Sequence, residues 1–376
     1  MYCWNSESGE IMKILYVTNA RLCSGAEDHL LDVSLWLRDR DVEPVFIIRE
    51  GGMLKERLDS YGLRYFQAFV PGRRISSIFR IARILQQELP DVVSVNREYN
   101  ILPLYIAERM TSPFIKKRPK MVSVLHTPTG RWCPGIGTFD GVIATSEYTA
   151  ESFFRTNRGI KEKTSLIYHG IKLPETDHEA KCQRNRLRRV FRDRQFPIIG
   201  MSGELWKNQA ELVDVARFLV KVYPEITIAI IGGYEGGTAL REKIDASGLG
   251  DNFILTGRLD RKLMPDVFYD LDLSVSTHRN EGFGLVHIES MAGYTPVVAY
   301  NSGGLVEILR NGGGVLVDGT TEDFAKAVID LLGNDGKRKS IGLQGRKVVE
   351  ENFSIDAMGK NHLAFYEKML GKDRVI

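Results

Sequence analysis

The chain has 376 residues, of which 43% are hydrophobic and 26% are charged. This length and composition allow about two globular domains with full cores, and they exclude a chain that is disordered throughout. With 51 Lys and Arg against 48 Asp and Glu, the net charge is only +3, so bulk charge does not indicate a nucleic-acid-binding protein.

Targeting and cysteine patterns favour a cytoplasmic protein. No apolar run approaches the roughly 18 residues that cross a bilayer, and the first ten residues lack the basic start and apolar stretch of a secretory signal. The four cysteines are Cys3, Cys23, Cys133 and Cys182, and none forms a CxxC pair. This spacing argues against a disulfide framework and a zinc site, and for a reducing compartment.

The first half of the chain alternates between strand-like and helical patterns. Residues 12–18 form a short apolar strand pattern, and leucines at helical spacing follow Ser24 as far as Leu37. Further strands are predicted at 45–48, 91–95, 121–125 and 141–145. The alternation predicts a parallel α/β domain at 12–175, with polar and glycine residues at the strand ends where such sheets bind ligands.

A second α/β series follows Pro197. Its predicted strands are 198–202, 226–231, 252–256, 273–276, 296–299 and 314–317, with helices at 209–222 and 321–332. We therefore expect a second domain at 184–354, and two Rossmann-like, doubly wound domains that face a cleft.

An arginine-rich stretch, 184–194, opens the second domain. We interpret this stretch as a solvated helix, because it lacks the interleaved aromatic residues that stack on bases, so no nucleic-acid partner is expected.

A glycine-rich turn after the strand at 273–276 carries the clearest functional pattern. Glu281 stands at the turn, and Glu289 follows eight residues later on a predicted helix. The amides that open this helix belong to Gly282, Phe283, Gly284 and Leu285. Amides at a helix N-terminus lack intrahelical acceptors and favour anions. Phosphate held by these amides, with sugar-type hydroxyls bound by the two carboxylates, is the chemistry that this segment predicts.

The E-x7-E pattern of Glu281 and Glu289 resembles the retaining glycosyltransferases of the GT-B fold, family 4. The resemblance covers nearly the whole chain. Its other segments are 24–27, 126–127, 146–148, 167–171, 257–259, 268–276, 303–308 and 353–354. It implies a C-terminal helix, 355–376, that crosses back to the first domain. It also implies metal-independent, hexosyltransferase-like transfer from a nucleotide-diphosphate sugar to an acceptor hydroxyl, with retention of configuration and no cofactor.

The resemblance also implies roles for single residues. His126 would contact the donor sugar near its reacting carbon, Lys207 would neutralise the leaving diphosphate, and Glu281 would hold sugar hydroxyls. Glu289 would accept hydrogen bonds from the ribose hydroxyls. The remaining donor contacts are expected at Gly25, Gly203, Arg258, Leu259, Gly282, Phe283, Gly284 and Leu285.

One residue departs from the family pattern and leaves alternatives open. Glu204 stands where the family usually has an Arg, so three options remain for the second cation: Arg279, Arg21 or none. The departure favours the alternative of a non-catalytic nucleotide-sugar-binding protein. Another GT-B chemistry, such as that of a phosphorylase or an epimerase, is the second alternative. Asp270-Leu-Asp272 resembles a manganese-binding triplet, but we interpret it as the start of a buried strand.

The acceptor is the least specified part of the expectation. A glycan, a lipid-linked sugar or a small molecule would each provide a hydroxyl. The basic, apolar stretch at 73–85 could contact an anionic membrane beside a lipid-linked acceptor. An ordinary surface helix of the first domain explains the same pattern, so peripheral membrane contact stays an option for this cytoplasmic protein.

Overall fold

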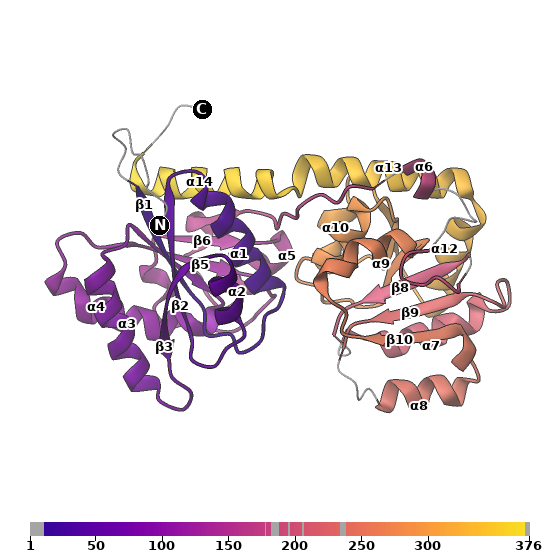
Figure 1. Cartoon of the computed structure of the whole chain (residues 1–376), viewed down its shortest axis with the longest axis horizontal. Helices are drawn as coiled ribbons and strands as arrows, with labels where there is room; N and C mark the ends of the chain where they lie inside the picture. The colour runs from indigo at the N-terminus through magenta and orange to yellow at the C-terminus, as the bar shows by residue number, and fades with distance from the viewer. Residues whose placement is uncertain are drawn as a thin grey trace. The chain divides into compact units, whose positions relative to one another are not determined.

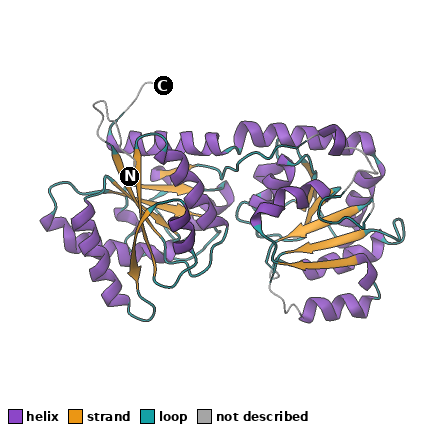
Figure 2. Cartoon of the chain, viewed as in Figure 1, coloured by secondary structure: helices purple, strands orange, loops and turns teal. Residues whose placement is uncertain are grey.

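The computed structural model describes residues 11–176, 178–181, 188–194, 196–204, 207–233 and 238–372. The chain divides into two compact units, Met1–Gly170 with Ile355–Ile376, and Ile171–Ser354. Each unit contains one sheet of parallel strands with helices packed on both of its faces (Figures 1 and 2). This is the predicted doubly wound α/β architecture.

The sheet of the first unit has seven strands in the order β3-β2-β1-β4-β5-β6-β7. The strands are β1 (Met12–Val17), β2 (Val42–Arg49), β3 (Arg64–Phe69), β4 (Val92–Asn96), β5 (Lys120–Leu125), β6 (Gly141–Ala144) and β7 (Thr164–Leu166). The helices are α1 (Gly25–Arg38), α2 (Leu54–Ser60), α3 (Arg74–Glu88), α4 (Ile101–Thr111), α5 (Glu147–Phe154) and α14 (Ile355–Leu370). The strand order reverses between the neighbours β1 and β4, which marks the expected ligand edge of this sheet.

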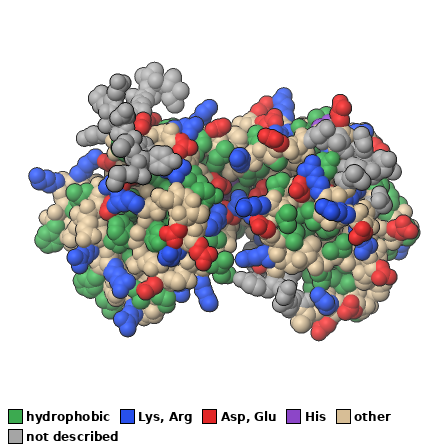
Figure 3. Space-filling model, viewed as in Figure 1, with side chains coloured by type: hydrophobic (Ala, Val, Ile, Leu, Met, Phe, Trp, Pro, Cys, Tyr) green, Lys and Arg blue, Asp and Glu red, His purple; other side chains and the backbone are tan. Residues whose placement is uncertain are grey.

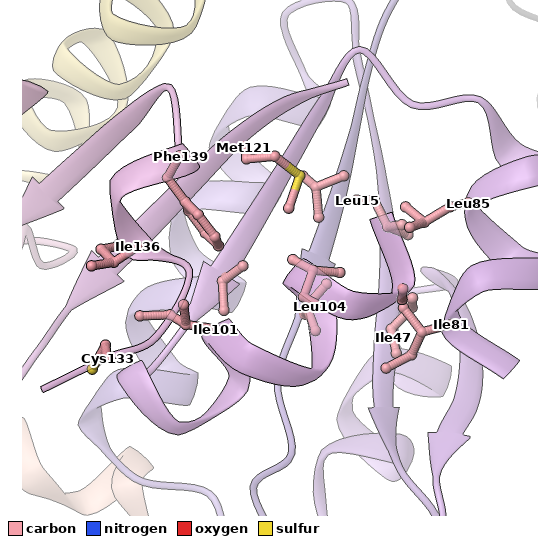
Figure 4. Close-up of a cluster of buried hydrophobic side chains, with 14 of the residues drawn as sticks. Leu15, Ile47, Ile81, Leu85, Ile101, Leu104, Met121, Cys133, Ile136 and Phe139 are labelled. Carbon is pink, nitrogen blue, oxygen red and sulfur yellow. The ribbon is translucent and has the colours of Figure 1, made fainter. Parts of the chain in front are cut away.

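Alternate residues of β1 enter two hydrophobic clusters on opposite faces of this sheet. Leu15 and Val17 pack in a cluster with α3 and α4 side chains such as Ile81 (Figure 4). Ile14 and Tyr16 pack in the other cluster, with side chains from α1, α2 and α14. Because successive strand side chains point to opposite faces, a strand that is apolar throughout is buried on both of them.

The sheet of the second unit has six strands in the order β10-β9-β8-β11-β12-β13. These strands are β8 (Ile198–Ser202), β9 (Thr227–Ile231), β10 (Phe253–Gly257), β11 (Leu273–Ser276), β12 (Val297–Tyr300) and β13 (Gly314–Val317). Its helices are α6 (His178–Lys181), α7 (Gln209–Leu219), α8 (Thr238–Ser247), α9 (Met264–Asp270), α10 (Leu285–Ala292), α11 (Leu305–Leu309), α12 (Thr321–Gly333) and α13 (Asp335–Asn352). Here the order reverses between β8 and β11.

The last helix returns to the first unit. α13 belongs to the second unit and α14 to the first, where α14 packs on α1. Trp36 Nε1 donates a hydrogen bond to Asp356 Oδ1 at 2.6 Å, and a Cβ at Gly359 would lie only 2.2 Å from the Trp36 ring. The predicted returning helix is therefore confirmed, although residues 373–376 of its predicted range lie outside the described residues.

The arginine-rich stretch differs from the solvated helix that we predicted. Residues 184–187 lie outside the described residues, and 188–194 form turns rather than a helix. Arg188 is buried and donates to Asp272 Oδ2 at 3.0 Å. Asp270 accepts from the backbone N–H groups of Val190 at 2.6 Å and Phe191 at 2.8 Å. The stretch is non-helical because the two aspartates that precede β11 bind its backbone and one arginine.

The Asp270 contacts predict a large stability difference between two aspartates of the same region. Asp270→Ala leaves the N–H groups of Arg189, Val190 and Phe191 without their acceptor and should lower the free energy of unfolding by about 3 kcal/mol. Asp266→Ala removes only a half-exposed ion pair with Arg189 and should cost about 0–1 kcal/mol. Urea unfolding of both variants checks this, and equal losses would contradict it.

Candidate functional site

The predicted donor residues of the second unit gather at the reversal of its strand order. Gly203 follows β8 directly, and Glu281 follows β11 in the turn before α10. β8 and β11 are neighbours in the sheet, so the segments that leave their carboxyl ends meet. In open α/β sheets this crevice is where ligands bind. The sequence-predicted residues are therefore assembled by the topology and not only by their order in the chain.

Lys207 and Glu281 form an ion pair at this edge. Lys207 Nζ lies 2.7 Å from Glu281 Oε2, and the two side chains are 18% and 12% exposed. Gly203 has φ +146°, and a Cβ there would lie 2.9 Å from Lys207 Cδ, so glycine leaves room for the lysine stem. Burial alone would raise the pKa of the Glu281 carboxyl, but Lys207 outweighs burial and holds this pKa below its usual value. Glu281 is thus ionised at neutral pH.

The turn between Glu281 and α10 is shaped by glycines. Gly284 is the residue before α10 and has φ +108°, a left-handed conformation that favours glycine. Gly304 donates its N–H to the Glu281 carbonyl at 2.8 Å, and a Cβ at Gly304 would come within 2.3 Å of the Gly282 carbonyl oxygen. This close approach fixes the turn that presents Glu281 and the first amides of α10.

Gly304→Ala should disturb this turn. Because the added Cβ meets backbone rather than a flexible side chain, the expected loss in the free energy of unfolding is about 1–3 kcal/mol, with weaker nucleotide binding. Gly336→Ala is the matched control, since its Cβ would lie an ordinary 3.6 Å from the nearest atom. Thermal unfolding with and without nucleotide measures both effects, and a Gly304→Ala protein that behaves like the control would contradict this description.

The second carboxylate and the predicted base-binding residues lie on neighbouring segments. Glu289 projects from α10 with a 24% exposed side chain, 3.9 Å from an Arg261 nitrogen. Arg258 and Leu259 follow β10, where Leu259 packs at the edge of a hydrophobic cluster. Arg258 Nη2 lies 3.1 Å from Glu204 Oε1. Glu204, which departs from the family pattern, is therefore paired with a cation of the same unit.

The two candidate second cations come from different units. Arg279 donates to Glu211 at 2.8 and 3.1 Å, and its guanidinium lies 3.6 Å from the centre of the Tyr300 ring. Arg21 belongs to the first unit, where it is exposed. Arg258, which we predicted only as a base contact, reaches the loop after β8 through its ion pair with Glu204.

The first unit carries its own polar cluster at the β1–β4 reversal. Gly25 is the first residue of α1. His126, directly after β5, is buried, and its Nε2 contacts Asn96 Oδ1. Arg97 has φ +75° and donates to both carboxylate oxygens of the fully buried Glu27, at 3.1 and 2.9 Å.

The sequence interpretation missed Asn96, Arg97 and the burial of Glu27. One signal was available, since Asn96 and Arg97 are polar residues at the carboxyl end of the apolar strand β4, which is the edge that binds ligands in such sheets.

Within the described ranges, no three His, Cys, Asp or Glu side chains are grouped so that they could hold a metal ion. None of the helices in the described part of the chain is long and apolar enough to cross a membrane. On the face shown in Figure 3, Lys and Arg side chains are interspersed with Asp and Glu over each unit.

Comparison with solved structures identifies the class of fold. HepE from Anabaena, crystallised with UDP and glucose, has a TM-score of 0.76 at 21% identity over 94% of this chain and 98% of that chain. A glycosyltransferase from Rickettsia africae ESF-5 has a TM-score of 0.79 at 21% identity, with 96% and 99% covered. The fold is that of the GT-B glycosyltransferases.

Family models place the chain more closely. Residues 184–348 match the model described as "Glycosyl transferases group 1", and residues 23–174 match "Glycosyltransferase Family 4". The chain belongs to the family 4 glycosyltransferases. It is 27% identical to the 2-deoxystreptamine glucosyltransferase of Streptomyces kanamyceticus over 66% of this chain and 65% of that protein, so the match spans slightly less than two thirds of that relative's length.

Proposed function

We propose that this protein is a retaining glycosyltransferase that moves a hexose from a nucleotide-diphosphate sugar to an acceptor hydroxyl. The observation that carries the proposal is the Lys207–Glu281 pair beside the N-terminus of α10, where the strand order of the second unit reverses. A cation, an ionised carboxylate and helix-terminal amides suit a diphosphate that is attached to a hydroxyl-rich ring. The family match and the UDP in HepE support the same assignment.

In this mechanism the second unit stabilises the departing diphosphate. Lys207 and the amides of Phe283, Gly284 and Leu285 meet its growing negative charge, because preorganised donors aimed at developing charge lower the barrier most. Glu281 accepts hydrogen bonds from sugar hydroxyls, and Glu289 accepts from the ribose. The proposal assigns this charge stabilisation to protein groups and not to a metal ion, so turnover is expected to persist in EDTA.

The anomeric configuration is retained if the acceptor attacks the same face of the sugar ring from which the diphosphate departs. Transfer passes through an oxocarbenium-like state, and the departing phosphate takes the acceptor proton, so no Asp or Glu base is required. His126 contacts the donor sugar near the reacting carbon. Gly25 and Gly203 allow the backbone to approach the donor, Gly282 extends the amide-lined turn, and Arg258 and Leu259 lie toward the base.

The alternative of a non-catalytic nucleotide-sugar binder rests on Glu204. Its carboxylate is paired with Arg258 and so does not add an unpaired negative charge next to the proposed diphosphate site. The structure therefore supplies no observation that favours this alternative over transfer.

A cavity in the first unit supports an acceptor with a polar head and an apolar part. It has a volume of about 740 Å³. Its charged and aromatic lining includes Arg49, Arg74, Arg131, Tyr99 and Trp132. Arginines suit phosphate, and aromatic faces pack well against sugar rings or lipid chains. We propose a glycan or lipid-linked sugar as the acceptor class.

Contact with an anionic membrane would fit the same acceptor. Ile75 and Phe79 of α3 are 73% and 59% exposed, and Arg74 and Arg80 lie on the same helix. Flotation of the protein with vesicles of phosphatidylglycerol, but not of phosphatidylcholine, would support peripheral contact. Absence of the protein from both vesicle fractions would contradict it.

The proposed function is tested with a panel of UDP- and GDP-hexoses and a set of glycan and prenyl-diphosphate-sugar acceptors. We expect one donor to support transfer, with product whose anomeric configuration, read by NMR, matches that of the donor. Transfer with inversion would contradict the retaining mechanism. Phosphate-dependent release of the sugar 1-phosphate would instead identify a phosphorylase.

A further inference from the structure

Four buried histidines lie together inside the first unit. His29 comes from α1, His126 follows β5, His169 follows β7, and His362 comes from α14. Their exposed fractions are 3%, 8%, 3% and 1%. The ring centre of His29 lies 4.4 Å from that of His169 and 5.2 Å from that of His362, and His126 and His169 are 5.2 Å apart. Only His126 has a proposed role, so the other three require an explanation.

Three of these rings form a linear chain of contacts that ends at Asn96. His29 Nδ1 lies 2.8 Å from His169 Nδ1. His169 Nε2 lies 3.5 Å from His126 Nδ1, and His126 Nε2 contacts Asn96 Oδ1. Each contact joins two nitrogens or a nitrogen and an oxygen, so one partner must carry a proton and the other must not.

Asn96, at the end of this row of contacts, determines which nitrogen of each ring carries the proton. Asn96 Nδ2 faces the Ala26 carbonyl oxygen at 3.4 Å, and only the NH₂ group of an amide can donate to a carbonyl. Asn96 Oδ1 therefore faces His126 as an acceptor, and His126 must carry its proton on Nε2. The opposite orientation of the Asn96 amide would set two oxygens against each other.

The proton positions of the two neighbouring rings follow from that of His126. A neutral His126 with a proton on Nε2 has a bare Nδ1, which accepts from His169 Nε2–H. His169 then has a bare Nδ1, which accepts from His29 Nδ1–H. This leaves His29 Nε2 as a bare nitrogen, and it is buried without a hydrogen-bond partner among the described residues.

All four rings are neutral in this environment. Burial lowers the pKa of His29 to about 3, and it lowers the pKa values of His126, His169 and His362 well below the usual value. The charged group that faces His126 is Arg97, which lowers its pKa further. At neutral pH no ring therefore carries protons on both nitrogens, and each contact keeps one donor and one acceptor.

We propose that His169 and His29 are positioning residues that, together with Asn96 as the acceptor of the His126 Nε2–H, hold the His126 ring in one tautomer and one orientation at the carboxyl end of β5. The catalytic part of this inference rests on the proposed function, whereas the tautomer assignment does not. Breaking the His169–His126 contact would leave His126 Nδ1 without its donor, so that only Asn96 would hold the ring in place.

The tautomers are read by long-range ¹H–¹⁵N NMR of the full-length protein labelled with ¹⁵N-histidine. We expect protons on His126 Nε2, His169 Nε2 and His29 Nδ1. A wild-type spectrum with the His126 proton on Nδ1 would overturn the proposal, and this arm needs no variant. The predicted tautomers in a protein that transfers no sugar would support the assignment and contradict the proposed function.

Three variants test the effect on catalysis. His169→Phe keeps a ring but removes the donor to His126 Nδ1. We expect the His126 ring ¹⁵N signals to shift and broaden as the ring loses its fixed orientation, and kcat to fall roughly tenfold, the size of one hydrogen bond, with donor KM changed less than twofold. His169→Gln retains an N–H near the position of Nε2 and should restore the signals and most of kcat. His362→Phe, whose ring nitrogens have no partner among the described residues, should leave both unchanged. A His169→Phe enzyme with wild-type His126 ring signals and wild-type kcat would overturn the proposal.

Discussion

Replacement of Lys207 by Ala is expected to lower kcat about 10²- to 10³-fold, the loss typical when one preorganised group that stabilises transition-state charge is removed. Lys207 Nζ is held 2.7 Å from Glu281 Oε2 and is mostly shielded from water, so its charge is neither mobile nor fully screened. The charge on the diphosphate at this edge grows as the sugar leaves. The loss should therefore appear mainly in kcat rather than in donor KM, as steady-state kinetics will show.

The matched control is Lys243→Ala. Lys243 also forms an ion pair in the second unit, with Asp214 at 2.6 Å, but both side chains are more than one third exposed. It should keep wild-type kcat. Wild-type turnover in Lys207→Ala would show that another group neutralises the leaving diphosphate, and Arg258 would then be the first residue to examine.

Glu281→Gln should be the second severe variant, with kcat/KM lowered at least about 100-fold. The change keeps the shape of the side chain but removes the acceptor charge, and it leaves Lys207 in a half-buried position without its counter-charge. Because the folded-state pKa of Glu281 lies below its usual value, its contribution to stability is complete above the unfolded-state pKa. That contribution is lost only as pH falls through the folded-state value.

The lowered pKa of Glu281 also predicts how kcat/KM depends on pH. Protonation of Glu281 should not reduce kcat/KM between pH 6 and 8, and the decline that it causes in the wild type should lie below the ordinary glutamate pKa of about 4.3. Glu322→Gln, at a mostly exposed position on α12, serves as the control. A Glu281→Gln enzyme with wild-type kcat/KM would contradict the proposed site.

The fold of the second unit was more predictable than that of the first. All six of its strands coincide with apolar runs in the sequence, including the edge strands β10 and β13, which are only partly buried. In the first unit the sequence did not predict β3 (Arg64–Phe69) or β7 (Thr164–Leu166). Both are edge strands of the sheet. An edge strand is only partly buried and tolerates polar residues such as Arg64 and Gln67, so its apolar pattern is weak.

In the candidate site, contacts between residues close in sequence were predictable, whereas contacts between distant segments were not. Glu281, Gly284 and α10 are close in sequence, so the motif predicted their turn. The Arg258–Glu204 pair and the His29–His169 contact join segments that are far apart in the chain. No local pattern predicts them, because they depend on which strands are neighbours in the sheet.

The central claim is that the donor binds where the strand order of the second unit reverses. Hydrogen exchange of the full-length protein, with and without UDP or GDP, tests it most directly. We predict slower exchange in peptides that cover 203–208 and 281–289 when the nucleotide of the active donor is added, and no change in α8 (Thr238–Ser247). Protection confined to segments outside these two ranges would contradict the account.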